Sequence, residues 1–152
     1  MSILNINDLA LKLVALDFSD GHTPNNDGPT KTSRALAIIH LAAHDAYIKV
    51  TKNTALTVKL GNLPIPPSTL DSSEATGCAA LLGAGLRAAV LLYPDFEKFI
   101  IAEAAKLRSP NQSCCEQDLA FNYGSQVADA WIEHRKNDGS QAPQLDRPGA
   151  RL

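Results

Sequence analysis

The segment from Gly28 to Lys52, GPTKTSRALAIIHLAAHDAYIKVTK, determines how the rest of the chain is expected to fold. Pro29 suits the first helical position, where its missing N–H costs no hydrogen bond. The spacing predicts a helix over residues 29–51, whose broad apolar face carries Leu36, Ile39, Ala43, Tyr47 and Val50. Because Ile38 and Leu41 lie nearly opposite that face, the middle of the helix is apolar all round. This pattern is typical of a buried helix, so we expect residues 29–51 at the centre of a bundle.

Periodicity and capping residues predict four further helices. The first would run from Asp8 to Phe18, with Asn7 or its neighbour as its cap. The spacings of residues 71–74 and 113–116 are those of capping boxes, for helices that end near 92 and 136. Another helix is expected over 94–108. The expected fold class is therefore all-α, a bundle of about five helices formed by residues 1–139, followed by an extended or disordered tail at 140–152.

Two features between these helices need an interpretation. Thr54 to Leu60 alternates like a strand, but an isolated strand would lack a pairing partner. Gly77, Gly83 and Gly85 lower helix propensity within 74–92, by about 1 kcal/mol each. We interpret these glycines as positions where another helix crosses closely.

Composition excludes several function classes. The net charge is −2, and no basic cluster is interleaved with aromatic residues, so neither nucleic acid nor an anionic membrane is an expected partner. The three cysteines, Cys78, Cys114 and Cys115, do not suggest a disulfide framework. We see no signal peptide and no apolar run of about 18 residues, and therefore expect a cytoplasmic protein.

Few residues are arranged for chemistry. His40 and His44 share one helical face at the spacing of metal ligands, but they supply only two ligands, so His40 is interpreted as a hydrogen-bonded structural residue. Arg34 and Asp45 lie three turns apart and cannot reach each other, so each is expected to pair with another helix or with water. With Trp131, on the buried face of the last helix, these are structural candidates. We expect no catalytic, cofactor-binding or metal-binding residue in this chain.

One family resemblance follows from these segments. The run from Arg34 to His40, with Asp45-Ala46 after it, resembles the Arg-Ala-Leu-Ala-x-x-His…Asp-Ala helix of vanadium-dependent haloperoxidase-like proteins, in the type-2 phosphatidic acid phosphatase superfamily. The run from Tyr123-Gly124 to Arg135-x-x-Asp138-Gly139 is similar to a family helix that ends in Arg-x-x-Asp-Gly. The resemblance covers most of the chain through scaffold positions.

The family's catalytic segments are missing from the chain. The resemblance implies an oxyanion held by a Lys-x6-Arg-Pro segment, a Ser-Gly-His segment and a final Arg and His. Here Arg147-Pro148 has Ser140, not lysine, seven positions before Arg147, and no Ser-Gly-His occurs. Vanadate would therefore require a partner chain that supplies the site.

Three hypotheses remain open. The chain is a helical scaffold half of a haloperoxidase-like or acid-phosphatase-like protein, as a subunit, a fragment or a free-standing derivative. In that case a second helical chain or a second copy should cover an apolar surface. Alternatively, it is a stand-alone helical interaction module without catalytic activity. The third hypothesis is a small metal-binding bundle that uses His40, His44 and a carboxylate.

Overall fold

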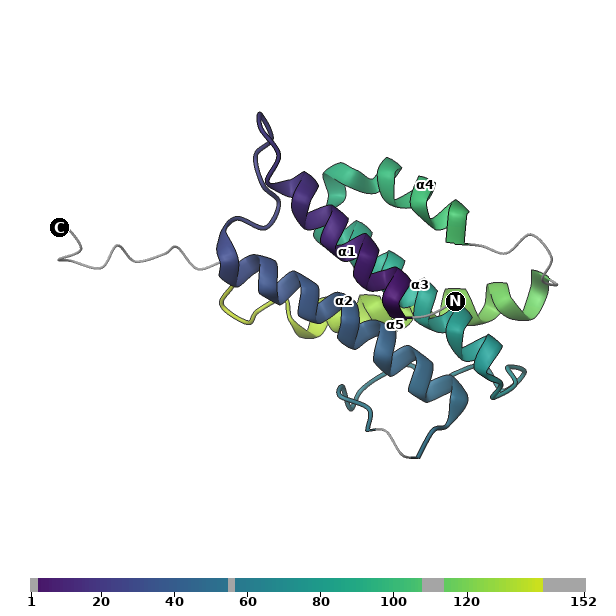
Figure 1. Cartoon of the computed structure of the whole chain (residues 1–152). Helices are drawn as coiled ribbons and strands as arrows, with labels where there is room; N and C mark the ends of the chain where they lie inside the picture. Colours follow the sequence, from purple (N-terminus) through teal and green to yellow (C-terminus); the bar gives the residue numbers. More distant parts are fainter. Residues whose placement is uncertain (1–2, 55–56, 108–113, 141–152) are drawn as a thin grey trace.

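The chain forms a bundle of α-helices, seen here in a computed structural model that describes residues 3–54, 57–107 and 114–140 (Figure 1). No strand is present in these residues, and the predicted all-α fold class is confirmed. The helices are α1 (Ile3–Asp17), α2 (Gly28–Thr51), α3 (Glu74–Leu92), a 3-10 turn η1 (Pro94–Phe96), α4 (Glu97–Leu107) and α5 (Cys114–His134). Three parts of the prediction lie outside the described residues: the tail beyond residue 140, the capping residue Ser113, and residues 55–56 of the strand-like segment.

Three long helices, α2, α3 and α5, make up the body of the bundle. α3 packs against both α2 and α5, and more than half of its 19 residues are buried. Fewer than half of the 24 residues of α2 are buried, and its exposed side includes Ser33 and Ala37. α1 and α4 lie on the outside of this body (Figure 1). The centre of the bundle is therefore shared by α2 and α3, and one side of α2 faces outward.

The glycines of α3 confirm the predicted close helix crossings. A Cβ atom placed on Gly83 would lie 2.0 Å from the Phe121 carbonyl oxygen of α5. A Cβ on Gly124 of α5 would lie 1.9 Å from the Ala80 oxygen of α3. The two backbones approach so closely that any side chain at these positions would collide with main-chain atoms.

Some predicted helix ends were wrong by a few residues. α1 begins at Ile3 rather than Asp8, because the fully buried Ile6 packs against α3 at Gly85 and extends the apolar stripe toward the N-terminus. α3 is capped by Ser73, whose side chain accepts from the Thr76 amide at 3.2 Å. Asp71, predicted as the cap, instead accepts from the Ser73 amide at 3.2 Å.

The segment after α3 also differs from its prediction. Pro94 opens a single 3-10 turn, and the α-helix expected from Pro94 begins at Glu97. α4 has one buried residue, Ile100, and is the helix least covered by the others. α5 ends at His134, two residues before the predicted end.

α3 is also apolar enough, by length and composition, to cross a membrane. An 18-residue window of this helix has a mean hydropathy of 1.7, although no apolar run of about 18 residues was expected from the sequence. In the bundle, 61% of that window is buried against the other helices. A core helix has the same composition, so the cytoplasmic location stays a prediction.

Candidate functional site

The buried polar centre of the molecule is Asp45, on α2. Its side chain is 0% exposed, and its carboxylate accepts four hydrogen bonds. Two come from the backbone amides of Lys59 and Leu60, at 2.8 and 2.9 Å. The others come from Trp131 Nε1 of α5, at 3.2 Å, and from His44 Nδ1, at 3.0 Å. Asp45 therefore connects α2 to α5 and to the segment that follows α2.

These donors explain why a carboxylate is tolerated in the core. A buried charge is costly unless hydrogen bonds replace its lost water, and here both oxygens are occupied. The Trp131 side chain is 6% exposed, so its indole N–H would be unpaired without Asp45. The structure thus brings together two predicted structural candidates, Asp45 and Trp131.

The two histidines of α2 are held through the same ring nitrogen. His40 Nδ1 lies 2.7 Å from the Leu36 carbonyl oxygen, and His44 Nδ1 lies 3.0 Å from Asp45 Oδ1. A carbonyl or an ionised carboxylate only accepts, so each Nδ1 carries the hydrogen. Both rings are half-buried. The predicted hydrogen bond of His40 is thus made within its own helix, while His44 bonds to the central carboxylate.

Arg34 lies at a different contact, between α2 and the chain that follows α5. Its Nε donates to Asp138 Oδ2 at 2.7 Å, and its Nη2 donates to the Arg135 carbonyl oxygen at 2.7 Å. The Arg34 guanidinium and the hydrogen bond from the Ser140 amide hold the pKa of Asp138 well below its usual range. The structure therefore separates Arg34 from Asp45 and gives each its own partner.

Sequence reasoning missed a second buried carboxylate, Asp17, at the end of α1. It is also 0% exposed and accepts from the Asn25 and Asn26 amides at 2.8 and 2.9 Å. The Asn25 side-chain amide donates to Oδ1 at 2.8 Å, and His22 Nε2 lies 3.3 Å from the same oxygen. The available signal was two adjacent asparagines shortly after an aspartate at a helix end, which is a loop-closing pattern.

Tyr93, at the end of α3, adds a buried hydroxyl near this second cluster. The residue is 0% exposed, and its hydroxyl has no hydrogen-bond partner in the part of the chain that the structure describes. Burial, with the nearby charge of Asp17, raises the pKa of Tyr93 to about 12. The phenol therefore stays neutral and is no source of an acid or base near pH 7.

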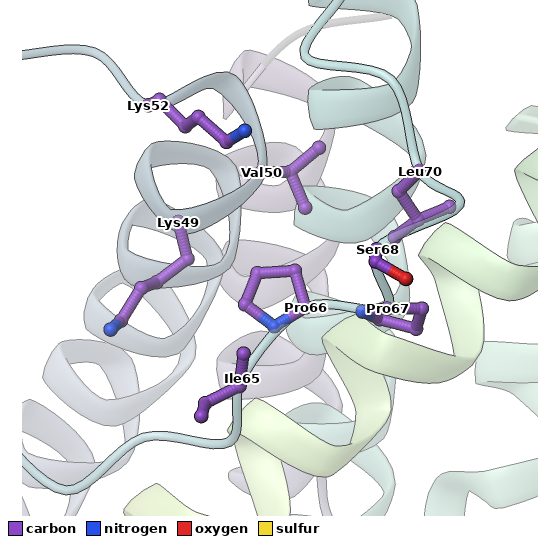
Figure 2. Close-up of a pocket in the computed structure, with 8 residues that line it drawn as sticks. All are labelled: Lys49, Val50, Lys52, Ile65, Pro66, Pro67, Ser68 and Leu70. Atoms are coloured by element: carbon purple, nitrogen blue, oxygen red, sulfur yellow. The ribbon is translucent and has the colours of Figure 1, made fainter.

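A surface groove of about 360 Å³ lies where the end of α2 meets the 63–70 segment (Figure 2). Its walls are formed by Lys49, Lys52 and Val50 on one side and by residues 65–68 and Leu70 on the other. Ile65 is 87% exposed, the largest exposure among the large hydrophobic side chains that the structure describes. Among the described residues that line the groove, the ionisable groups are the amines of Lys49 and Lys52, and none is a carboxylate or an imidazole.

The arginines of the described residues do not fit an oxyanion site. Arg34 and Arg135 both pair with Asp138, and Arg87 pairs with Asp129 at 2.8 Å. An oxyanion cradle needs unpaired cations and converging donors. Residues 3–54, 57–107 and 114–140 also hold no cluster of three or more histidine, cysteine or acidic side chains suited to a metal ion. Among the described residues, these three arginines therefore do not converge on an oxyanion site of the kind that the resemblance implies.

Comparison with known proteins does not add a relative: no family model, no curated protein and no solved structure matches this chain.

Proposed function

We propose that this chain is a helical scaffold subunit of a haloperoxidase-like or acid-phosphatase-like assembly, and that a second chain carries its oxyanion site. The observation that carries the proposal is that the two segments with the family resemblance bond to each other. Arg34 of the first segment pairs with Asp138 of the second at 2.7 Å. Asp45 of the first also accepts from Trp131, inside the second segment, at 3.2 Å. The resembling residues thus hold one framework together.

An exposed apolar stripe on α1 supports the need for a second chain. Leu4 and Leu11 are seven residues apart and therefore lie on one side of the helix, and Phe18 follows seven residues later, directly after α1 ends at Asp17. They are 71%, 54% and 48% exposed. Exposed apolar groups that lie in a row favour contact with another protein surface. The same stripe also supports the second candidate function, a stand-alone helical interaction module.

Purification of the tagged full-length chain from its native cells tests the proposal. We expect a second helical chain with Lys-x6-Arg-Pro and Ser-Gly-His segments to co-purify. Halide oxidation with peroxide and vanadate, or phosphate-ester hydrolysis, should require both chains. A partner without these segments, or a complex inactive in both assays, would leave the interaction module. A lone chain would contradict both functions.

A matched pair of variants locates the contact. Leu11→Lys should reduce recovery of the second chain, because a charge would enter the apolar stripe. Ile101→Lys on α4, where Ile101 is 59% exposed, is the control and should leave recovery unchanged. Equal recovery with both variants would exclude the α1 stripe as the contact surface.

A further inference from the structure

We propose that His40 and His44 form a two-histidine site for a divalent transition-metal ion on the outward side of α2. The two residues are four positions apart in one continuous helix, so their side chains lie on successive turns of the same side. Ala37 and Ser33, about one and two turns before His40 on that side, are exposed. The side of α2 that carries the two rings is therefore accessible from solvent.

The protonation of both rings suits metal binding. Each Nδ1 carries its hydrogen toward an acceptor, Leu36 O for His40 and Asp45 Oδ1 for His44. A neutral imidazole with Nδ1–H has its free electron pair on Nε2. Neither Nε2 has a hydrogen bond within the described residues. Metal-bound histidines in proteins are oriented in the same way, with the other nitrogen donating to a carbonyl or a carboxylate.

The carboxylate beside His44 does not act as a ligand. Both oxygens of Asp45 are occupied by the Lys59 and Leu60 amides and by Trp131 and His44. Asp45 is a positioning residue that fixes the tautomer and direction of the His44 ring. The described residues offer no third ligand, so water would complete the coordination sphere. Two imidazoles favour Zn²⁺, Ni²⁺ or Cu²⁺ over Mg²⁺ and Ca²⁺, which prefer oxygen ligands.

Titration of the full-length chain with NiCl₂ at pH 7.5 tests this site. We expect saturable binding of one ion that weakens by about tenfold or more in His40→Gln and in His44→Gln, because each variant loses one ligand. His134→Gln is the matched control, since His134 is exposed near the end of α5 and should not contribute. The three cysteines remain in every variant and contribute equally.

Two further measurements separate ligand loss from damage to the fold. Far-UV circular dichroism should show equal helix content in all variants. In the unmodified chain, substoichiometric Ni²⁺ should broaden the imidazole NMR signals of His40 and His44 together and leave His22 and His134 sharp. Acidification to pH 5.5 should weaken binding, because protonated imidazole is not a ligand.

Three results would overturn the proposal. One is the absence of Ni²⁺ binding to the unmodified chain. Another is unchanged binding in both α2 variants, which would assign the ion to cysteines or to another surface. The third is broadening of only one of the two rings, which would indicate a single histidine with adventitious metal.

Discussion

Asp17 and Asp45 are two completely buried aspartates with the same number of hydrogen bonds but different sources for them. Asp17 accepts all four from residues within nine positions of itself, in the loop after α1. Asp45 accepts from its neighbour His44, from amides 14 and 15 positions away, and from Trp131, 86 positions away. Asp17 thus closes one loop, whereas Asp45 connects three parts of the chain.

This difference determines what each carboxylate can stabilise. Removal of Asp17 would leave one buried donor, the Asn26 amide, without an acceptor, whereas the half-buried His22 and Asn25 can bond to water. Removal of Asp45 would leave the buried Leu60 amide and the Trp131 indole without an acceptor. An unpaired buried donor costs more than a lost hydrogen bond that water replaces. The long-range carboxylate should therefore contribute more to stability than the local one.

The largest effect is expected for Asp45→Ala. Three buried or half-buried donors lose their acceptor, so the free energy of unfolding should fall by about 3–5 kcal/mol. Urea denaturation followed by circular dichroism measures this loss. Asp45→Asn is the control: it preserves the shape and one acceptor oxygen, and it should cost less than Asp45→Ala. A loss below that of Asp17→Ala would contradict the comparison.

Asp17→Ala should cost less, about 1–3 kcal/mol, because only one of its donors, the Asn26 amide, is buried and the others can turn toward water. The same urea experiment measures it. Hydrogen exchange should show the damage confined to the 22–26 loop and the adjoining end of α1. Faster exchange throughout α5 would mean that Asp17 also acts at long range, against the comparison.

Trp131→Phe separates one long-range bond from the rest of the Asp45 network. Loss of the indole N–H should cost about 1 kcal/mol for the hydrogen bond, with an added loss from the smaller ring. In an Asp45→Ala background the same substitution should cost less, because the acceptor is already gone. Equal costs in both backgrounds would show that the bond contributes nothing. Tyr123→Phe is a matched control, since its hydroxyl bonds to the Pro64 oxygen instead.

Acidification should lower the free energy of unfolding through Asp17, the carboxylate whose hydrogen bonds are local. Burial alone would raise the pKa of Asp17, but the hydrogen bonds from Asn25, Asn26 and His22 outweigh it and hold that pKa below 3.8. Because the folded pKa lies below the unfolded one, this stabilisation is complete above about pH 4 and is lost as the pH falls through the folded pKa. Asp17→Asn should therefore flatten the decline of unfolding free energy below pH 4. An unchanged decline would assign it to other carboxylates.

The contrast also shows what sequence alone could predict. The five helices, the close crossings at Gly83 and the separation of Arg34 from Asp45 all follow from spacing within one segment. The start of α1 was missed because Asn7 matches a cap, while the burial of Ile6 depends on a distant helix. The cap of α3 was misplaced by two residues because Asp71 and Ser73 both fit capping patterns.

The hydrogen-bond partners of the structural candidates could not be predicted from the sequence, for a related reason. Nothing near Asp45 in the chain indicates that Trp131 and the Leu60 amide converge on it, because that depends on how three elements pack. Asp17 is the opposite case, since both asparagines lie in the next loop. Contacts within a segment can be predicted from its pattern, whereas contacts between segments require the relative placement of helices.

The smallest expected effect on stability is that of the other long-range contact, the ion pair between Arg34 and Asp138. The side chains of this pair are 18% and 12% exposed, compared with 43% and 50% for the pair of Arg87 and Asp129. Water and salt screen the more exposed pair, Arg87 and Asp129, more strongly, and Arg34 also donates to the Arg135 oxygen.

A double-mutant cycle of Arg34→Ala and Asp138→Ala should give a favourable coupling energy that decreases from low to high salt. The Arg87–Asp129 cycle should give a smaller coupling at every salt concentration. If the two cycles give equal coupling energies, Arg34 and Asp138 form an ordinary surface ion pair. In that case only the long-range hydrogen bonds of Asp45 stabilise the bundle.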